Sequence, residues 1–401
     1  MKILYITTDG FDTPGPNNQM AMVMISDFLK AGFNVHLVQS RRKKINHDIP
    51  SLLQGRAGFT YDVVDRKVID KTRFMNRYLD EASYAFTSYK KWKKVKDAEV
   101  VFLQSCPTMI YQLIMLRLFN RKPIVCNIYD VFPGHAYDIG VIKSKFIYNM
   151  IKFIQKFTYK MSSIITVLSE DMKKKVIEQK VPAEKIRVVP AWYDDKTVCE
   201  IPLESNKFNK KYNIPTDKFY VQFAGTIGYV FNYRAILEVA NFLKDEPEIV
   251  FQIIGDGNVK QKFVDEAEKQ QLTNIQFYPL QPIEIVPDVY SACSICIIPL
   301  SKGVIGNGVP SKVPLLMACR RVIVNSVEQD SEYFKMFNEN GIGVSVTNSD
   351  YKTLAEAILD LYQHPEKVTE MADKAKTFGE ANYTSTINTN KFIDIFRELA
   401  R

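Results

Sequence analysis

Short apolar segments alternate with amphipathic segments along most of this chain of 401 residues, and the alternation occurs twice. The first set has strand-like segments at 2–7, 34–40, 99–105, 122–130, 163–169 and 186–190, with helical spacing between several of them. The second set has strand-like segments at 219–224, 248–254, 274–280, 294–300, 320–326 and 341–346. Strands that alternate with helices form parallel sheets covered on both faces. The sequence therefore predicts an α/β protein.

The chain is too long for a single hydrophobic core, so two domains are expected. We predict two doubly wound, Rossmann-like domains that face each other across a cleft, because such sheets bind ligands beyond the carboxyl ends of their strands. Residues 1–195 form the first domain and residues 196–383 the second, and the polar stretch 192–219 connects them. The last helix, 384–401, is expected to cross back to the first domain.

The spacing of the cysteines and the hydropathy of the sequence indicate the cellular compartment of the protein. The six cysteines are scattered, and Met1 and Lys2 lead directly into a strand-like segment, which favours a reducing cytosolic location. Cys293 and Cys296 form a CxxC pair inside a buried-strand pattern, and we interpret them as core residues rather than metal ligands. No segment has the length of unbroken apolar sequence that a spanning helix needs.

The two halves differ in charge. Residues 1–190 contain 31 Lys+Arg and 17 Asp+Glu, a net charge of +14, whereas the remaining 22 Lys+Arg and 28 Asp+Glu give −6. The first half is therefore expected to meet an anionic surface. Nucleic acid is one such surface, but no nucleic-acid-binding motif is present.

Three glycine-containing loops follow strands of the second half. Gly225 and Gly228 lie in the first loop, Gly255 and Gly257 flank Asp256 in the second, and Gly306 and Gly308 precede Ser311 and Lys312 in the third. Glycines allow a ligand to approach the backbone closely, and helix starts supply N–H donors for phosphate. Lys312 stands before an apolar helical run, where the helix dipole disfavours a cation unless an anion binds there. Alternatively, each glycine is an ordinary turn and Lys312 a tolerated surface lysine.

The order of these motifs resembles the retaining family-4 glycosyltransferases of the GT-B fold, and in particular the bacterial branch that builds O-antigen, capsule and colanic acid. The likeness covers nearly the whole chain: MKILYITTDG and GPNN at the start, KAGFNVHLVQS, CNIYDVFP, the stretch ending VVPAWYDD, then FAGTIG, IIGDG and VPSKV. The resemblance implies that a nucleotide-diphosphate sugar, expected to be UDP-linked, binds the second domain and that an acceptor binds the first. It also implies sugar transfer with retention, without a metal or another cofactor.

The resemblance assigns roles to individual residues. The positions expected to contact the donor are Gly15, Asn17, Gly225, Gly228, Arg234, Gly255, Gly257, Leu280, Gln281, Gly308, Ser311 and Lys312. Lys312 is expected to neutralise the diphosphate leaving group, a form of electrostatic stabilisation of growing charge. Asp130 is the other catalytic candidate, although an aspartate in a loop often only caps a turn.

Several positions depart from the family pattern. Asn307 and Leu315 occupy the places of two glutamates that many members carry, and Tyr129 replaces a histidine near the reacting sugar. Thr226 and Phe231 replace an Arg and a Lys near the glycine-rich turn, for which Arg234 is the candidate substitute. These changes keep an alternative open: a non-catalytic, nucleotide-sugar-binding partner subunit or regulator.

Two basic segments indicate an anionic membrane as partner. YKKWKKVK at 89–96 interleaves lysines with Trp92, which is expected to insert at the headgroup level. The stretch 142–161 places Phe146, Met150, Phe153 and Phe157 on one helical face, beside several lysines. The same pattern fits a helix that packs its apolar stripe on the sheet, which is more common. We expect a polyprenyl-diphosphate-linked or other saccharide acceptor and a peripheral location on the cytoplasmic face of the membrane.

Overall fold

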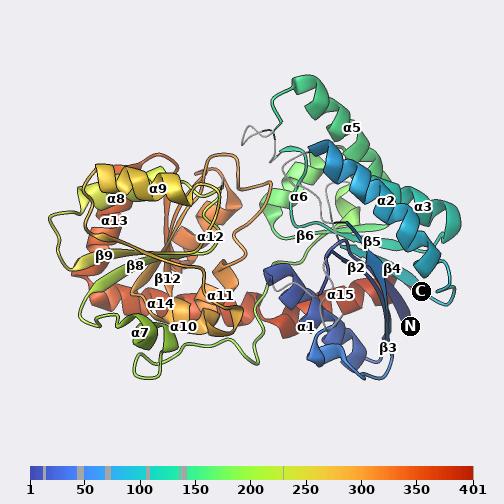
Figure 1. Ribbon diagram of the computed structural model, residues 1–401, viewed down its shortest axis with the longest axis horizontal. Helices are drawn as coiled ribbons and strands as arrows, with labels where there is room; N and C mark the ends of the chain where they lie inside the picture. The colour runs from blue at the N-terminus through green and yellow to red at the C-terminus, as the bar shows by residue number, and fades with distance from the viewer. Residues whose placement is uncertain are drawn as a thin grey trace. The chain divides into compact units, whose positions relative to one another are not determined.

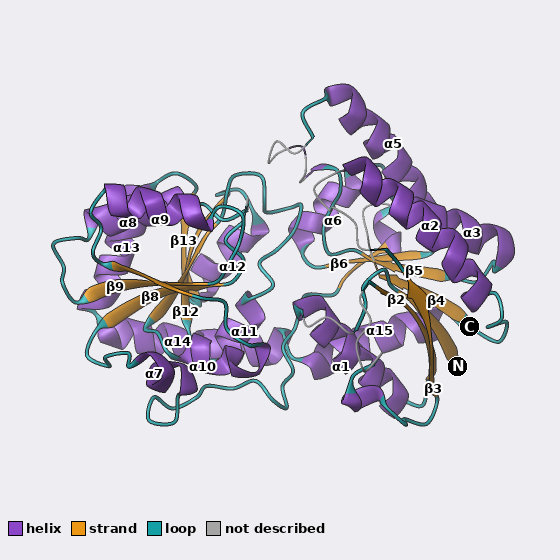
Figure 2. Ribbon diagram, in the orientation of Figure 1, coloured by secondary structure: helices purple, strands orange, loops and turns teal. Residues whose placement is uncertain are grey.

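The computed structural model describes residues 1–11, 15–42, 49–67, 74–104, 109–134, 137, 142–228 and 230–400; the side chains at 16–17 and 74–78 lie outside this description. The chain divides into two compact units, each built on a parallel sheet (Figures 1 and 2). The first unit comprises residues 1–191, 306–308 and 385–401, and the second comprises 192–305 and 309–384.

The first unit contains a seven-stranded sheet in the order β3-β2-β1-β4-β5-β6-β7. Its strands are β1 (Lys2–Ile6), β2 (Asn34–Arg41), β3 (Phe59–Asp65), β4 (Val100–Gln104), β5 (Ile124–Asn127), β6 (Ile164–Val167) and β7 (Ile186–Val188). Its described helices are α1 (Pro16–Lys30), α2 (Phe74–Trp92), α3 (Ile110–Phe119), α5 (Lys145–Met161), α6 (Glu170–Ile177) and α15 (Ser385–Leu399). All strand pairs are parallel, as the sequence predicts.

Helices cover both faces of this sheet. In Figure 2, α1 and α15 lie on one face, and α2, α3 and α5 lie on the other. An aromatic cluster fixes the first pair: Phe396 on α15 packs edge-on against Phe28 of α1, and Phe102 of β4 contacts both Phe392 and Phe396. These rings are buried, and aromatic side chains of this size dominate the energetics of a core. The last helix is therefore an integral part of the first unit.

The second unit contains a six-stranded parallel sheet in the order β10-β9-β8-β11-β12-β13. Its strands are β8 (Phe219–Ala224), β9 (Ile249–Ile254), β10 (Ile275–Tyr278), β11 (Ile295–Pro299), β12 (Val322–Val327) and β13 (Gly343–Thr347). Its helices are α7 (Lys207–Tyr212), α8 (Tyr233–Phe242), α9 (Lys260–Lys269), α10 (Val286–Ser291), α11 (Val313–Ala318), α12 (Glu332–Asn340), α13 (Tyr351–Gln363) and α14 (Pro365–Asn382).

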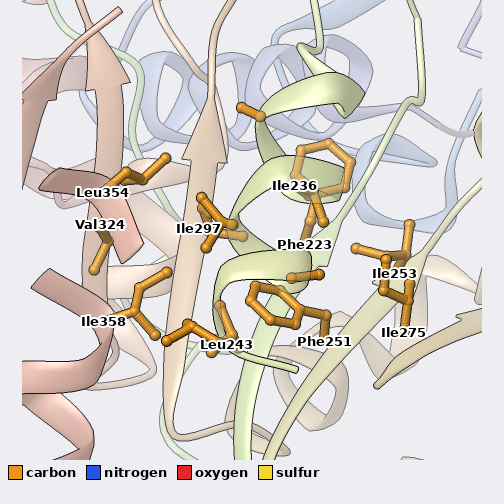
Figure 3. Packing of buried hydrophobic residues seen from close by; sticks show 14 of the residues in the cluster. Phe223, Ile236, Leu243, Phe251, Ile253, Ile275, Ile297, Val324, Leu354 and Ile358 are labelled. Carbon is orange, nitrogen blue, oxygen red and sulfur yellow. The ribbon is translucent and has the colours of Figure 1, made fainter. Parts of the chain in front are cut away.

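A separate apolar cluster lies on each face of the second sheet. Figure 3 shows the cluster beneath α8, where Ile236 and Leu243 pack against Phe223, Phe251 and Ile297 from the strands. The cluster on the other face includes Cys293 and Cys296, whose sulfur atoms lie 3.5 Å apart in the interior. Their interpretation as core residues is confirmed. Burial on both faces explains why these strands consist of almost unbroken apolar runs.

Two local features differ from the sequence-based expectations. β3 was not predicted, because it is a half-exposed edge strand with aspartates at positions 62 and 65. The stretch taken as a connection contains α7, whose Phe208 is completely buried in the second unit. Within the described residues, no helix is both long and apolar enough to cross a membrane.

Candidate functional site

The strand order of the second sheet creates a switch point between β8 and β11. From β8 the chain proceeds outward through β9 and β10, and from β11 it proceeds outward in the opposite direction through β12 and β13. The loops that leave the carboxyl ends of β8 and β11 therefore diverge, which is where open α/β sheets bind their ligands. The glycine loop that begins at Gly225 follows β8, and the segment that leads to Lys312 follows β11.

The loops after β8 and β9 approach each other too closely for any residue but glycine. The Gly225 N–H donates a hydrogen bond to the Ile254 carbonyl oxygen at 2.9 Å. A Cβ added to Gly255 would lie 1.9 Å from the Gly225 oxygen, and Gly255 has a φ of +147°. The Gly255 N–H donates to Tyr278 at the end of β10, so three successive strand ends are tied together. At the next loop, Ile227 donates to the Asp256 oxygen, and Gly257 also needs to be glycine.

The loop after β8 also contacts the end of β11. Ser301 N–H donates to the Val230 oxygen and Asn232 N–H to the Pro299 oxygen, both at 2.9 Å. Phe231 and Leu300 form an antiparallel bridge between them. The backbone on both sides of the switch point is therefore held in place before any ligand binds. Gly228 lies in this loop, and a Cβ added there would have its nearest neighbour at 3.5 Å.

Lys312 reaches from the β11 side of the switch point to the β8 side. Its ammonium nitrogen lies 3.6 Å from the centroid of the Phe223 ring. A Cβ on Gly225 would lie 2.8 Å from the same nitrogen, so this glycine leaves room for the lysine. Part of the side chain reaches the surface, but burial of the ammonium group lowers the pKa of Lys312 to about 7. No carboxylate among the described residues forms an ion pair with it.

These observations describe a cation that has no counter-ion within the part of the chain that the structure describes. A buried charge is costly unless a partner of opposite sign is nearby. Contact with the face of an aromatic ring replaces only part of the lost hydration. Lys312 directly precedes α11, and Ser311 beside it is exposed. The arrangement therefore favours a small anion that binds at the switch point, where the ammonium and nearby backbone N–H groups could both contact it.

Leu280 and Gln281, which follow β10, differ in their exposure to solvent. Leu280 is 65 % exposed, whereas Gln281 is buried. The Gln281 amide nitrogen donates to the Tyr212 hydroxyl at 2.9 Å, and its oxygen accepts from the Lys211 ammonium at 3.2 Å. The side chain of Gln281 is thus held by α7, and only Leu280 is free to contact a ligand through its side chain. Sequence reasoning missed Lys211 and Tyr212, which it assigned to a connecting segment; the aromatic-rich FNKKYN pattern was the available signal.

The side chains that interact with Arg234 are not those that interact with Lys312. It is exposed in the first turn of α8, and the groups that act on it are Tyr233, Glu266 and Tyr351. Asn232 caps this helix by accepting a hydrogen bond from the Ala235 N–H. No interaction of Arg234 with the glycine loops is evident in the described part of the chain.

The predicted residues of the first unit follow β1 and β5. Gly15 has an extended backbone and precedes α1, so Asn17 falls in the first turn of that helix, with its side chain outside the described residues. Asp130 is exposed in the loop after β5, and one of its oxygens lies 2.9 Å from where a Cβ on Gly308 would be. Residues 306–308 belong to the first unit, and the Val131 N–H donates to the Asn307 oxygen at 2.7 Å.

A polar network beside the first sheet's own switch point, buried at Tyr5 and Gln104 and exposed at Asp9, was not predicted. The Tyr5 hydroxyl on β1 donates to the Gln104 side-chain oxygen on β4, and the Gln104 amide nitrogen donates to Asp9 at 3.3 Å. Burial raises the pKa of Tyr5 well above its usual value, so this phenol remains protonated. Polar residues inside otherwise apolar strands were the signal that could have identified this network.

Comparisons with known proteins identify the family of this chain. Residues 20–197 match the family model described as Glycosyltransferase Family 4, and residues 204–378 match the one described as Glycosyl transferases group 1. WbjE of Pseudomonas aeruginosa, named as a probable glycosyltransferase, is 25% identical over 335 residues, or 82% of either chain. WcaI of Escherichia coli, whose name refers to a glycosyl transferase of colanic acid biosynthesis, is 25% identical over 52% of this chain and 53% of its own.

The fold is also that of solved glycosyltransferases. The crystal structure of HepE from Anabaena in complex with UDP-glucose superposes with a TM-score of 0.73 and 13% identity. The superposition covers 99% of this chain and 100% of HepE. The two parallel sheets of seven and six strands are thus those of the GT-B fold, as the sequence analysis expects.

Proposed function

The chain belongs to glycosyltransferase family 4, and from this premise we propose that it transfers a hexose from a UDP-linked donor to a lipid-linked saccharide with retention of anomeric configuration. The coarser statement, that it is a nucleotide-sugar-dependent glycosyltransferase, follows from the family. The proposal extends this to the donor nucleotide, the acceptor and the residues involved.

Lys312 is the observation that carries the donor assignment. Its ammonium lies at the switch point of the second sheet against Phe223 and Gly225, without an anionic partner among the described residues. A nucleoside diphosphate supplies that anion. Charge on the diphosphate grows as the bond from its oxygen to the anomeric carbon breaks, so a fixed cation stabilises the transition state more than the ground state.

We propose further donor contacts in the loops that follow the strands of the second sheet. The backbone at Gly225, Gly228, Gly255, Gly257, Gly308 and Ser311 lies at or leads from the carboxyl ends of β8, β9 and β11 and is proposed to approach the phosphates and the sugar. Leu280 and the Gln281 backbone, at the end of β10, are proposed to contact the base. HepE was crystallised with UDP-glucose, which supports UDP as the nucleotide. Gly15, Asn17 and Arg234 stay proposed donor contacts on the basis of the family resemblance.

Asp130 is the proposed catalytic group of the first unit. Its carboxylate is exposed beyond the carboxyl end of β5 and lies against Gly308, four residues before Lys312 in the sequence. When the acceptor oxygen bonds to the anomeric carbon, the UDP–sugar bond breaks and the acceptor hydroxyl loses its proton. We propose that Asp130 orients this hydroxyl and accepts its proton.

The acceptor assignment rests on similarity and charge. The similarity to WcaI, whose name refers to colanic acid biosynthesis, supports a role in the synthesis of a bacterial surface polysaccharide. Such glycans grow on polyprenyl diphosphates, and the +14 net charge of residues 1–190 suits an anionic membrane face that carries them. A cytoplasmic, membrane-peripheral location is part of this proposal.

One observation favours a second candidate, a subunit that binds nucleotide sugar without catalysis. Leu315 occupies a position where many members carry a glutamate, and it packs against the apolar cluster beneath α11 instead of presenting a polar group. Such a protein would bind UDP but release none from a UDP-sugar.

The test is incubation with a panel of UDP- and GDP-sugars in excess EDTA, with and without a polyprenyl-diphosphate-linked saccharide. The proposal predicts UDP release from at least one UDP-hexose, increased by the acceptor and insensitive to EDTA. UDP binding without release would favour the non-catalytic subunit. Activity that disappears in EDTA and returns with manganese would contradict the metal-independent part of the mechanism.

A further inference from the structure

The helix α5 presents an apolar stripe to the exterior instead of to the sheet. Phe146, Met150, Phe153 and Phe157 are spaced by four, three and four residues, so they share one side of the helix. All four are exposed, with Phe146 at 78 % and Phe153 at 63 %. The opposite side supplies the packing, through buried residues that include Ile151 and Tyr159. The alternative in which this stripe packs on the sheet is therefore wrong.

The neighbouring helices of the same layer also expose apolar side chains. α3 packs between α2 and α5, and the three helices form one layer on the same face of the sheet (Figure 1). Ile114, Leu118 and Phe119 on α3 and Leu79 and Phe86 on α2 are also exposed. Large apolar side chains exposed in numbers on one helical layer usually mark an interaction surface. We call this layer, α2 with α3 and α5, the outer layer.

On two helices of the outer layer, α3 and α5, every charged side chain is positive. Neither α3 nor α5 contains an aspartate or glutamate, and α5 carries Lys145, Lys152, Lys156 and Lys160. Residues 100–169 contain eight Lys+Arg and only two acidic residues. None of the four α5 lysines forms an ion pair within the described part of the chain. The two acidic residues of α2 with described side chains, Asp80 and Glu81, are engaged by Arg66.

On α5 the cations flank the apolar stripe. Lys152, Lys156 and Lys160 are exposed and lie on the side of the helix adjacent to Phe153 and Phe157. Apolar side chains that enter the acyl region, bordered by lysines that reach anionic headgroups, are the arrangement by which an interfacial helix binds a bilayer. A second copy of the same surface would bring like charges together, which disfavours a symmetric dimer through this face.

We propose that the outer layer is a docking surface for an anionic lipid bilayer, with the stripe of α5 inserted at the headgroup–acyl boundary. The inference deepens the proposed function, because a lipid-linked acceptor lies at such a surface. It also corrects the expectation for Trp92, which is 1 % exposed and packs edge-on against Tyr89, so it does not insert. Lys91 forms an ion pair with Asp62 at 3.2 Å, so its charge is already partly neutralised. For both reasons we assign the membrane contact to α5 and not to residues 89–96.

Vesicle flotation, without donor or acceptor, tests the proposal independently of catalysis. Parent protein should float with vesicles that contain phosphatidylglycerol and remain in solution with phosphatidylcholine alone. The triple variant Lys152→Gln, Lys156→Gln and Lys160→Gln should bind about a hundredfold more weakly, since each surface lysine contributes a factor of about five. The variant Phe153→Ser and Phe157→Ser should lose flotation although all its lysines remain. Raising the salt concentration should release the parent protein.

Matched controls remove the same charge and apolar groups from the second unit. Lys262→Gln, Lys335→Gln and Lys376→Gln change three exposed lysines, and Leu203→Ser and Phe242→Ser change two exposed apolar residues. Both control variants should float like the parent. As an independent readout, a Phe153→Trp side chain should shift to shorter emission wavelength on the anionic vesicles. Trp92 and Trp192 are buried and supply a constant background.

Three results would overturn the proposal. One is equal binding to neutral and anionic vesicles, and another is flotation unaffected by the α5 substitutions. The third is a dimer, formed without lipid, that the Phe153→Ser and Phe157→Ser changes convert to monomer, because this would assign the surface to a second copy. If UDP release from the donor panel fails but the α5 variants behave as expected, the docking surface stands while the catalytic proposal does not.

Discussion

The ammonium nitrogen of Lys312 lies 3.6 Å from the centroid of the Phe223 ring, across the boundary between β11 and β8. The two residues are 89 positions apart in the sequence, and the sheet brings them together at its switch point. The ring faces a cation that has no carboxylate partner among the described residues. Within the described residues, the protein thus keeps a lysine without a carboxylate partner at the switch point, the place where open α/β sheets bind ligands. Such a buried cation is costly for stability unless an anion binds there.

Replacing Lys312 with methionine should therefore stabilise the free protein. The unfolded lysine keeps its proton up to about pH 10.5, whereas burial lowers the pKa in the folded protein to about 7. Between these values the unfolded state binds more protons, so the stability of the parent rises with pH across this window. Lys312→Met should raise the free energy of unfolding at pH 7 by on the order of 1–3 kcal/mol, and the gain should shrink towards pH 10. Urea denaturation measures both. A variant less stable than the parent at pH 7 would refute the desolvation argument.

UDP affinity should fall as the pH rises above 7. A bound diphosphate favours the charged lysine, so it raises the lowered pKa of Lys312 and binding takes up a proton. Below about pH 7 the lysine is already charged in the free protein and contributes no pH dependence. Calorimetry from pH 7 to 9, in buffers of different ionisation enthalpy, should show proton uptake and a loss of at most about tenfold per pH unit. The terminal phosphate of UDP is ionised throughout this range. Affinity that stays constant from pH 7 to 9 would argue against contact between Lys312 and the diphosphate.

Two glycines in the loops after β8 and β9 should respond differently to replacement by alanine. In Gly255→Ala the new Cβ meets the Gly225 oxygen at 1.9 Å, in a backbone conformation with a φ of +147°. The loop must shift, so we expect a loss on the order of 1–3 kcal/mol in the free energy of unfolding. Gly228→Ala is the matched control, because its nearest neighbours lie at 3.5 and 3.6 Å. Its stability should stay within about 1 kcal/mol of the parent. Equal effects of the two substitutions would show that the close approach of the loops is not maintained in solution.

Asp130→Asn should reduce turnover without weakening UDP binding. The amide keeps the shape of the side chain but cannot accept a proton from the acceptor, so kcat should fall by about a hundredfold or more. Asp97→Asn is the control, since Asp97 is exposed before the amino end of β4, whereas Asp130 follows the carboxyl end of the neighbouring strand β5. It should have parental kcat. If Asp130→Asn keeps the turnover of the parent protein, Asp130 is not the catalytic base and its role is to cap a turn.

The sequence predicted most of the fold because burial on both faces leaves an unambiguous pattern. Twelve of the strands in the two sheets are apolar runs that were recognised, and the remaining one, β3, was missed because edge exposure and its aspartates interrupt that pattern. The alternation of segments also predicted the parallel pairing. These features depend on local composition, which a single sequence displays.

The site was less accessible because it depends on contacts between distant segments. The Lys312 position was predicted as an anion site from its sign, but its contact with Phe223 and the resulting low pKa require the sheet order. The hydrogen bond from Gln281 to Tyr212 could not be predicted either, because Tyr212 lies on α7 and the polar sequence around this helix was interpreted as a connection. On α5 the periodicity showed that Phe153 and Phe157 share a face but not whether that face is inward or outward. Only the structure decides this, since both directions give the same pattern.

The central claim is that Lys312 holds the diphosphate of a nucleotide-sugar donor, and UDP calorimetry on Lys312→Met at pH 7 tests it most directly. Loss of the charge-assisted contact should weaken binding by about 1.5–3 kcal/mol, or roughly 10- to 150-fold. Lys335→Met, which removes an exposed lysine from α12, should bind UDP like the parent. If Lys312→Met is folded and binds UDP as tightly as the parent and the control, the donor site proposed at the β8–β11 switch point is wrong.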